Sequence, residues 1–382
     1  MKNKKRKNWL IVVAAILALA GIGMLVLHCT HIRIAGQWVR RNAKDIEFYG
    51  CSFGTKDMER LSELPNLRKL ALFYCDLQDV ATLSSLTDLK VLSLIWNEID
   101  DLSSLSALTN LDALVLYSDQ ISDPAPISAL KNLAWLDLRL NEISDLSTLS
   151  SLTNLTGLSL QGNQISDISA LSTLTNLDTL QLNTSQINDF SALSSLTNLT
   201  ELYIYGNAID DLSFLSPLIK LTSLTLSGNQ ISDTSALLSL KNLTELYLSS
   251  NPIDDLSVLS SLPNLTRLTL QFNQTSDLSV LSTLTKLTDL SLGYNHISDI
   301  SALSSLTNLT RLDLVGNQIG DISTLSSLTN LEWLWLDYNQ ISDISALSAL
   351  KCLERLDLTG NPLTQAQINS LKRALPRCMI SN

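Results

Sequence analysis

The sequence predicts a solenoid of short strand-and-turn repeats, preceded by one membrane-spanning helix. Three observations support this prediction. A 22-residue unit recurs without insertion over residues 67–361. Within each unit, leucines alternate along the first half and apolar residues recur every third position along the second half. Near the N-terminus, an uncharged apolar run over residues 9–27 follows a cluster of basic residues.

The N-terminal segment is typical of a signal-anchor. Residues 1–41 contain eight Lys or Arg and no Asp or Glu. A helix over the nineteen residues 9–27 would be roughly 28 Å long, close to the thickness of a bilayer's hydrocarbon core. Basic residues stay cytoplasmic, so we predict a cytoplasmic tail at 1–8, a transmembrane signal-anchor at 9–27 and a juxtamembrane linker at 28–42. Cleavage, which would secrete the protein, and lipidation at Cys29 remain alternatives.

Each repeat reads as a strand followed by a tight turn. The L-x-L segment has the period of two expected of a strand, and the spacing of three in the second half is that of a 3₁₀ turn. One unit cannot enclose its own leucines, so stacked units must bury them as one continuous core. We therefore expect a parallel sheet on a concave face and turns on a convex face. The unit at 155–176 is representative, with Leu155, Leu158, Leu160, Ile168, Leu171 and Leu174 at the apolar positions.

Two polar columns run through the units. Position 9 is Asn in eleven of the fourteen units that start between 67 and 353, and an inward amide there can satisfy backbone groups where the chain leaves the strand. Position 13 is Asp in thirteen units, just before the turn, where a carboxylate can accept amide protons. A row of bound calcium ions is the alternative interpretation of the aspartate column.

The repeats have atypical units at both ends. Residues 43–66 form a longer, irregular N-terminal repeat or cap, and residues 362–382 form a C-terminal cap. In the latter, Thr364 and Gln367 fit a capping box before a helix of about 12 residues. Cys51 and Cys75 fall on neighbouring ladder positions, so either a disulfide or two buried thiols is possible.

These motifs resemble the 22-residue leucine-rich repeats of bacterial internalins, which are close in length to those of the Sds22 type. The resemblance rests on L-x-x-L-x-L-x-x-N-x-I and on S-D-I-S-A-L-S-S-L-T-N, over residues 67–361 and more loosely over 43–382. It implies a leucine-rich-repeat solenoid of the α/β horseshoe class whose strand face holds a protein ligand. The anchor-like N-terminus departs from typical internalins, so invasion of host cells is not implied.

Composition argues against several classes of function. Beyond residue 41 the chain carries 18 basic and 37 acidic residues, so a phosphate backbone would be repelled and nucleic-acid binding is not expected. The three histidines and five cysteines show no metal-ligand spacing. Apart from the residues that the repeat pattern explains, the sequence shows no combination of nucleophile, base and acid that could serve catalysis. We therefore expect no enzyme, no cofactor and no metal site.

Unit positions 3, 5, 7 and 8 are left free by the core, so residues there can serve binding. Four of the six tryptophans fall on them, and aromatic residues and arginine are frequent hot spots of protein interfaces. At position 3, the row Glu245, Arg267, Asp289 and Arg311 alternates in charge and also suits cross-strand pairing. The candidate ligand-binding residues are Phe73, Tyr74, Trp96, Tyr117, Trp135, Arg139, Tyr203, Tyr205, Tyr247, Arg267, Phe272, Arg311, Trp333, Trp335 and Tyr338.

The sequence thus predicts a monomeric, membrane-anchored protein that presents its repeats outside the cytoplasm and binds a protein ligand on the concave face. The alternative is a surface adhesin or structural element that recognises glycans, since aromatic platforms also stack on sugars. Neither interpretation identifies the ligand.

Overall fold

The computed structural model describes residues 31–75, 77, 80–99, 101–118, 120–183 and 186–382. These form two compact units, one ending at Ile143 and the other running from Ser144 to Asn382. The expected tail at 1–8 and signal-anchor at 9–27 lie outside the described residues. Among the helices that are described, none is long and apolar enough to cross a bilayer.

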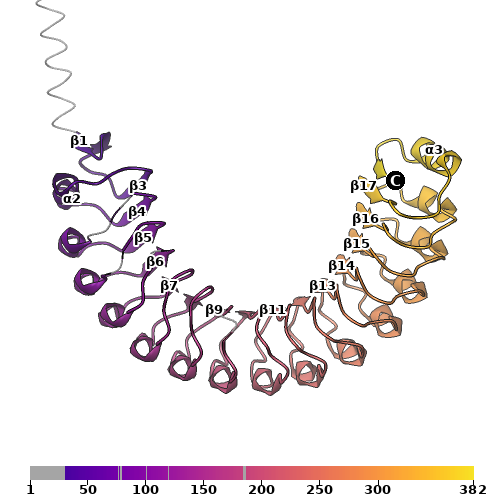
Figure 1. Cartoon of the computed structure of the whole chain (residues 1–382), viewed down its shortest axis with the longest axis horizontal. Helices are drawn as coiled ribbons and strands as arrows, with labels where there is room; N and C mark the ends of the chain where they lie inside the picture. The colour runs from indigo at the N-terminus through magenta and orange to yellow at the C-terminus, as the bar shows by residue number, and fades with distance from the viewer. Residues whose placement is uncertain (1–30, 76, 78–79, 100, 119, 184–185) are drawn as a thin grey trace, which may run out of the picture. The chain divides into compact units, whose positions relative to one another are not determined.

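In the first unit, five parallel strands lie in chain order, β3-β4-β5-β6-β7. Figure 1 shows these strands along one side of the unit and the turns along the other. The strands are β3 (Asp45–Tyr49), β4 (Lys69–Phe73), β5 (Val91–Ile95), β6 (Ala113–Tyr117) and β7 (Trp135–Asp137). The 3₁₀ turns are η1 (Ala81–Ser85), η2 (Ser103–Ala107) and η3 (Ala125–Ala129).

The N-terminal end of this unit contains more structure than the sequence predicted. Within the expected linker, β1 (His31–Ile34) and β2 (Gln37–Arg40) form an antiparallel hairpin. Ile32 and Ile34 are buried, which explains the alternation of apolar and polar residues in this segment. The irregular repeat that follows contains a true α-helix, α2 (Thr55–Ser62), which buries Met58 and Leu61. The hairpin and helix were missed because both are short and lie outside the 22-residue pattern.

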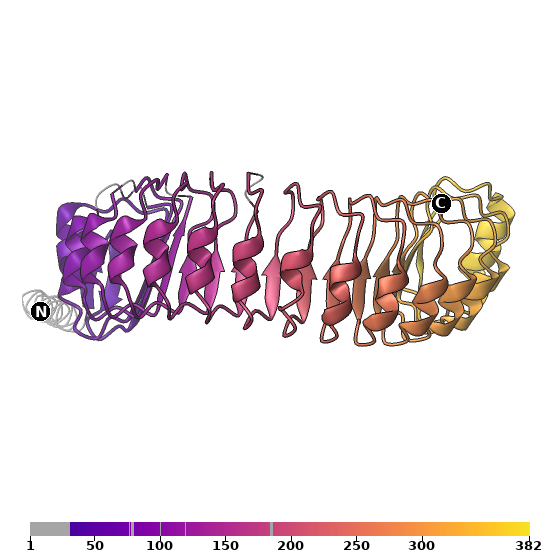
Figure 2. The ribbon, with the colours of Figure 1, turned by 90° about the horizontal axis from the view of Figure 1, so that it is seen from below.

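The second unit repeats the same arrangement from β8 to β18, again with each strand parallel to the next. Its strands are β8 (Gly157–Ser159), β9 (Thr179–Gln181), β10 (Glu201–Tyr203), β11 (Ser223–Thr225), β12 (Glu245–Tyr247), β13 (Arg267–Thr269), β14 (Asp289–Ser291), β15 (Arg311–Asp313), β16 (Trp333–Trp335), β17 (Arg355–Asp357) and β18 (Met379–Ser381). Figure 2 shows the turns lying side by side on the opposite face. They are η4 (Ser147–Ser151), η5 (Ser169–Thr173), η6 (Ser191–Ser195), η7 (Ser213–Leu215), η8 (Ser235–Ser239), η9 (Ser257–Ser261), η10 (Ser279–Thr283), η11 (Ser301–Ser305), η12 (Ser323–Ser327) and η13 (Ser345–Ala349).

Hydrogen bonds explain the spacing of three in the second half of each repeat. The Leu171 amide donates to the Ile168 carbonyl at 3.0 Å, Leu174 donates to Leu171 at 2.9 Å, and Leu177 donates to Leu174 at 3.0 Å. Each apolar residue therefore closes one three-residue turn and points into the core, where Leu171, Leu174 and Leu177 are fully buried. Burying one such side chain contributes roughly 1.5–3 kcal/mol, repeated several times in every unit.

The asparagine column forms a ladder between repeats, as predicted. The Asn295 side-chain amide donates to the carbonyls of Leu270 at 2.8 Å and Leu292 at 2.9 Å, while its oxygen accepts the Thr275 amide at 3.2 Å. Asn295 is buried, so these bonds satisfy backbone groups that water cannot reach. A second ladder occupies position 22, where Asn308 donates to the Thr285 carbonyl of the preceding repeat at 2.8 Å.

The C-terminal end is closed by α3 (Gln365–Ala374), whose N-cap is Thr364. The Thr364 amide donates to the Gln367 side chain at 2.9 Å, and the Gln367 amide donates back to the Thr364 hydroxyl at 3.4 Å. This is the capping box that the sequence predicts, although the helix has 10 residues rather than about 12. Ile368 and Leu371 are buried, and strand β18 follows the helix.

Candidate functional site

In the first unit, aromatic rings lie in an almost continuous row along the ends of the strands. Tyr49 stacks on Phe73 at 4.5 Å between ring centroids, and Tyr74 stacks on Trp96 at 5.9 Å. Trp96 in turn meets Tyr117 edge-on at 5.8 Å. Four of the predicted residues, Phe73, Tyr74, Trp96 and Tyr117, thus lie together in this row. Tyr49 was not predicted, because it lies in the irregular first repeat.

An arginine ends this row. The Arg139 guanidinium lies 5.1 Å from the centre of the Tyr117 ring and donates two hydrogen bonds to the Asp137 carboxylate, at 2.9 Å from Nε and 2.6 Å from Nη2. Asp137 is almost fully buried, so the arginine neutralises a carboxylate that water scarcely reaches. Trp135, at the start of the same strand, is 38% exposed.

In the second unit, the charge row at position 3 pairs across strands, as the sequence predicts. Arg267 lies 3.3 Å from Glu245 and 4.0 Å from Asp289, and Arg311 lies 3.2 Å from Asp289. The Tyr247 hydroxyl donates to Glu245 at 2.9 Å and accepts from Arg267 at 3.2 Å. This network is half-buried, and its charged groups pair with one another. The pairing favours a structural role for this row.

The tyrosines of the central strands differ in their hydrogen bonding and in their exposure to water. The Tyr203 hydroxyl donates to Glu201 at 2.9 Å, and burial raises the pKa of this phenol. Tyr205, two residues later, is 46% exposed. Of the predicted tyrosines Tyr203, Tyr205 and Tyr247, Tyr205 is therefore the best placed to contact a partner.

The tryptophans of β16 lie between charged rows. Pairing of β15, β16 and β17 places Trp333 between Arg311 and Arg355, and places Trp335 between Asp313 and Asp357. Both guanidinium groups lie over the Trp333 ring, at 4.6 Å for Arg311 and 5.6 Å for Arg355. The two indoles meet edge-on at 5.9 Å. They line a hollow of about 260 Å³ that also includes Arg311 and Asp313.

Position 8 has a backbone conformation that the sequence did not reveal. The chain there adopts a left-handed conformation, with φ between 53° and 76° at every described position. Glycine fills five of these positions, as the conformation favours. Five others carry large aromatic side chains, which are rare at positive φ: Tyr74, Trp96, Phe272, Tyr294 and Tyr338.

These position 8 aromatics are exposed, with between 45% and 60% of each residue open to water. Phe272 stacks on Tyr294 at 4.5 Å, with the rings 7° from parallel. Tyr294 is not among the residues that the sequence predicts for binding, yet the structure pairs it with Phe272, which is. The repeat position of Tyr294, identical to that of Phe272, could have identified it.

The aspartates of position 13 accept hydrogen bonds from backbone amides at the start of the turns. At Asp299, for example, the carboxylate accepts the Ser301 amide at 2.8 Å, and this hydrogen bond lowers the pKa of the aspartate. The carboxylate lies one residue before the N-cap, Ile300, rather than at the cap itself. Among the described residues, no group of three or more His, Cys, Asp or Glu is arranged to hold a metal ion. Cys51 and Cys75 are free thiols in this structure.

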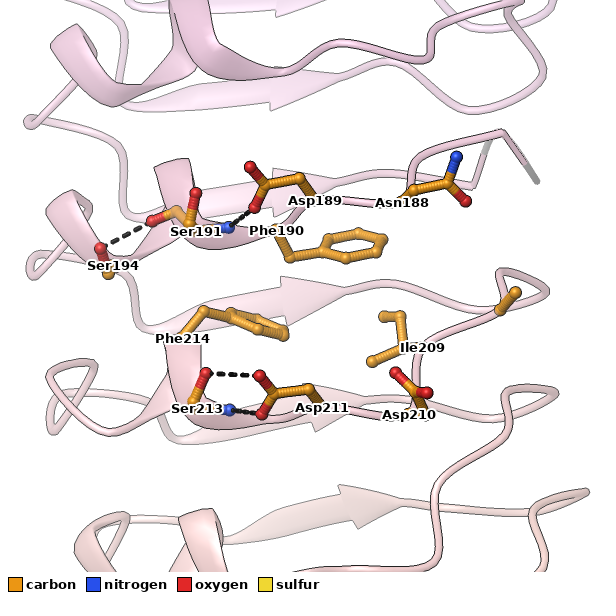
Figure 3. A pocket seen from close by; sticks show the side chains of 11 residues that line it. Asn188, Asp189, Phe190, Ser191, Ser194, Ile209, Asp210, Asp211, Ser213 and Phe214 are labelled. Atoms are coloured by element: carbon orange, nitrogen blue, oxygen red, sulfur yellow. Dashed lines mark hydrogen bonds between the residues drawn. The ribbon is translucent and has the colours of Figure 1, made fainter.

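On the turn face of the second unit, two neighbouring repeats depart from the usual residues at positions 14 and 16. Figure 3 shows Phe190 and Phe214 facing one another, with Asp189 and Asp211 accepting hydrogen bonds from the serines beside them. Both rings line a hollow of about 290 Å³. Phe190 replaces the usual Ile or Leu and Phe214 replaces a small residue, so the rings stack at 5.6 Å and are themselves nearly buried. This hollow is accounted for by packing and contains none of the predicted binding residues.

Comparison with known proteins agrees with the repeat structure. Residues 51–302 match the family model of a leucine-rich repeat region, and residues 285–327 and 329–373 match that of leucine-rich repeats in two copies. No curated protein matches the chain significantly.

Solved structures extend this likeness. An internalin of Listeria monocytogenes, InlF, is 34% identical with a TM-score of 0.66, and the match covers 85% of this chain and 91% of that one. A leucine-rich repeat protein of Leptospira interrogans is 26% identical with a TM-score of 0.72, covering 90% and 94%. A plant peptide hormone receptor, RGFR1, solved in complex with RGF2, is 22% identical with a TM-score of 0.58, covering 85% and 64%, and shows the fold alone.

Proposed function

Because this chain belongs to the leucine-rich repeat proteins and is of the internalin type, we propose that it is a binding scaffold that holds a protein ligand on its strand face. The observation that carries the proposal is the set of exposed aromatic side chains at position 8. Each of them keeps a left-handed backbone that glycine would adopt with less strain. Local strain of this kind is commonly retained where a side chain has a task other than folding.

The strand face offers two separate aromatic surfaces for such a ligand. The surface of the first unit consists of the row from Tyr49 to Tyr117 with Arg139, and that of the second unit consists of the β15–β17 strands with the Phe272 and Tyr294 pair. Trp96 is 45% exposed and Trp135 38% exposed, which is costly without a partner. A structurally similar plant receptor, RGFR1, was solved with a bound partner, RGF2, which supports the same use of the fold here.

We further propose that residues 9–27 anchor the protein and that the repeats are presented outside the cytoplasm. The support is the sequence: a basic cluster followed by an apolar run long enough to cross a bilayer. Extracytoplasmic presentation fits a scaffold whose task is to meet a partner. Carbonate extraction of membranes, together with protease accessibility of the repeats in intact cells, tests both points.

The binding proposal is tested by capturing a partner and then removing the aromatic surfaces. Proximity labelling with the full chain in its own membrane identifies candidate partners, and purified protein then confirms direct binding. We expect W96A/W135A or W333A/W335A to weaken binding by at least tenfold, because aromatic residues at the centre of an interface commonly contribute ~2 kcal/mol or more. Full binding by both of these variants and by F272A/Y294A, which removes the stacked position 8 pair, would rule out the strand face as the ligand site.

Glycan recognition is the second candidate, favoured by the parallel, exposed rings of Phe272 and Tyr294. Stacked rings of this kind present a flat apolar surface to a sugar. A glycan array probed with the full chain separates the two functions. Saturable glycan binding that F272A/Y294A abolishes, without any protein partner, would replace the protein-binding proposal.

A further inference from the structure

The surface of β15–β17 carries carboxylates that no basic residue of the described chain neutralises. Asp313 and Asp357 flank Trp335 on the neighbouring strands. Asp313 accepts the Val315 amide at 3.0 Å and a hydrogen bond from the Gln271 side chain. Asp357 accepts from the amide of Thr359 at 2.9 Å and from its hydroxyl at 2.6 Å. All of these donors are uncharged, so none of them brings a positive charge to either carboxylate.

A third carboxylate adds to this charge. Asp337 occupies position 7 of the same repeat as Trp335, two residues further along the chain. Burial raises its pKa, and the charges of Asp357 and Asp313 raise it further. The three carboxylates therefore repel one another across the strand ends, and a cation placed among them would relieve this repulsion.

The first unit shows a related arrangement with its cation in place, although its aromatic ring, Tyr117, stands at position 7 of the neighbouring repeat, whereas Trp335 stands at position 5. Asp137, like Asp313 and Asp357, stands at position 5 and accepts the amide of the residue at position 7. In that repeat the position 7 residue is Arg139, whose guanidinium binds the carboxylate and lies over the Tyr117 ring. In the second unit, position 7 is Val315 or Thr359, so the carboxylate and the aromatic ring are present and the guanidinium is missing.

From this comparison we infer that the surface around Trp335 receives a basic side chain of the partner, with arginine favoured over lysine, lying over the indole between Asp313 and Asp357. A planar guanidinium can stack on an indole and donate to carboxylates on either side at the same time, whereas an ammonium cannot match both demands. The acidic repeats, with 37 acidic against 18 basic residues beyond residue 41, also attract a basic partner. The inference rests on the proposed function and specifies the chemistry of its ligand.

A single metal ion fits this site less well. Asp313 and Asp357 stand two strands apart, which separates their backbones by roughly 9–10 Å, and Trp335 lies between them. Metal ligands must converge to within about 2–2.6 Å of the ion. The spacing instead suits an extended cation that covers the ring.

Peptide selection tests the inference. Random twelve-residue peptides displayed on phage are selected on the full chain held in mild detergent, and an enriched peptide is synthesised with and without citrulline in place of arginine. We expect the wild-type chain to enrich arginine, and the citrulline peptide to bind about tenfold more weakly. A wild-type chain that enriches no basic residue overturns the inference.

The matched variants are D313N/D357N and E201Q/E245Q, which remove the same charge from the same face. Asparagine can still accept the Val315 and Thr359 amides, so D313N/D357N should fold normally, which circular dichroism and thermal unfolding would verify. We expect D313N/D357N to lose about tenfold in affinity and to bind the arginine and citrulline peptides equally, while E201Q/E245Q keeps the preference. If D313N/D357N still prefers the arginine peptide over the citrulline peptide, the proposed site is wrong.

This experiment separates the inference from the function on which it rests. If partner capture depends on the tryptophan pairs but D313N/D357N leaves it intact, the scaffold function stands and the basic ligand is wrong. If W96A/W135A, W333A/W335A and F272A/Y294A all leave capture unchanged, the scaffold function itself fails.

Discussion

At the scale of single residues, position 8 shows how one backbone angle governs which side chains are tolerated. Gly316 has φ 64°, and a Cβ added there would lie 2.7 Å from the Tyr294 ring. Gly360 has φ 76° and stands in the same relation to Tyr338, at 2.8 Å. A repeat with an aromatic residue at position 8 is thus followed, in these two cases, by a repeat with glycine, which makes room for the ring.

The G316A variant should lose stability by roughly 1–2 kcal/mol, because alanine meets both the left-handed conformation and the Tyr294 ring. Gly320 is the matched control, since a Cβ there would meet only the Gln340 carbonyl at 3.9 Å and needs no left-handed backbone. Urea unfolding of G316A and G320A measures the difference. Equal midpoints for the two variants would show that neither the angle nor the ring matters.

At the scale of structural elements, the strand and the turn of each repeat are joined to the next repeat by two asparagine ladders. The inner ladder, at position 9, is buried and bonds backbone groups that water cannot reach. The outer ladder, at position 22, is exposed, so water can replace its bonds. Two asparagines of the same repeat should therefore differ in how much stability is lost when each is replaced.

The N295A variant should destabilise the second unit by about 2–3 kcal/mol, because it leaves the buried Thr275 amide without its acceptor and removes a donor from the Leu270 and Leu292 carbonyls. The comparison is N308A, which removes one exposed bond to Thr285 and should cost less than about 1 kcal/mol. Denaturant unfolding followed by circular dichroism gives both values. A cost for N308A as large as that for N295A would contradict this account of the inner ladder.

At the scale of the whole molecule, the aspartates of position 13 each add a small, pH-dependent contribution to the stability of the fold. Hydrogen bonds from the serine amides lower the pKa of Asp101, Asp167, Asp189, Asp233, Asp277, Asp299 and Asp321. A carboxylate whose pKa is lower when folded stabilises the fold at pH above its unfolded pKa, about 3.9. That contribution disappears as the pH falls through the lower, folded pKa.

Thermal stability should therefore be nearly constant from about pH 5 to pH 7 and should fall as the pH drops below about 4. A variant with Asp277, Asp299 and Asp321 changed to Asn should show a shallower fall, since asparagine accepts the same amide proton but does not titrate. Differential scanning calorimetry at pH values of about 3, 4, 5 and 7, which bracket the unfolded pKa, measures both proteins. Parallel pH profiles would mean that the column does not couple folding to protonation.

The repeat period determined most of this fold from sequence alone. The leucine spacing fixed which residues are buried, since 22-residue periodicity leaves one way to stack the units, and the asparagine ladder and the turns after each Asp followed from the same period. The hairpin at His31–Arg40 and the helix Thr55–Ser62 did not follow, because nothing repeats there: the hairpin packs against that helix, and the helix packs against the first turn, η1.

Only the tertiary structure decided how the free positions combine. The 22-residue period already places Trp333 in the same row as Arg311 and Arg355, and Trp335 in the same row as Asp313 and Asp357. The tertiary structure decided that both guanidinium groups lie over the Trp333 ring. Likewise, no sequence pattern revealed that position 8 is left-handed, because glycine and aromatic residues both occupy it. Side chains of different repeats meet through the stacking of strands, so their partners depend on register and backbone angle, which a single repeat does not contain.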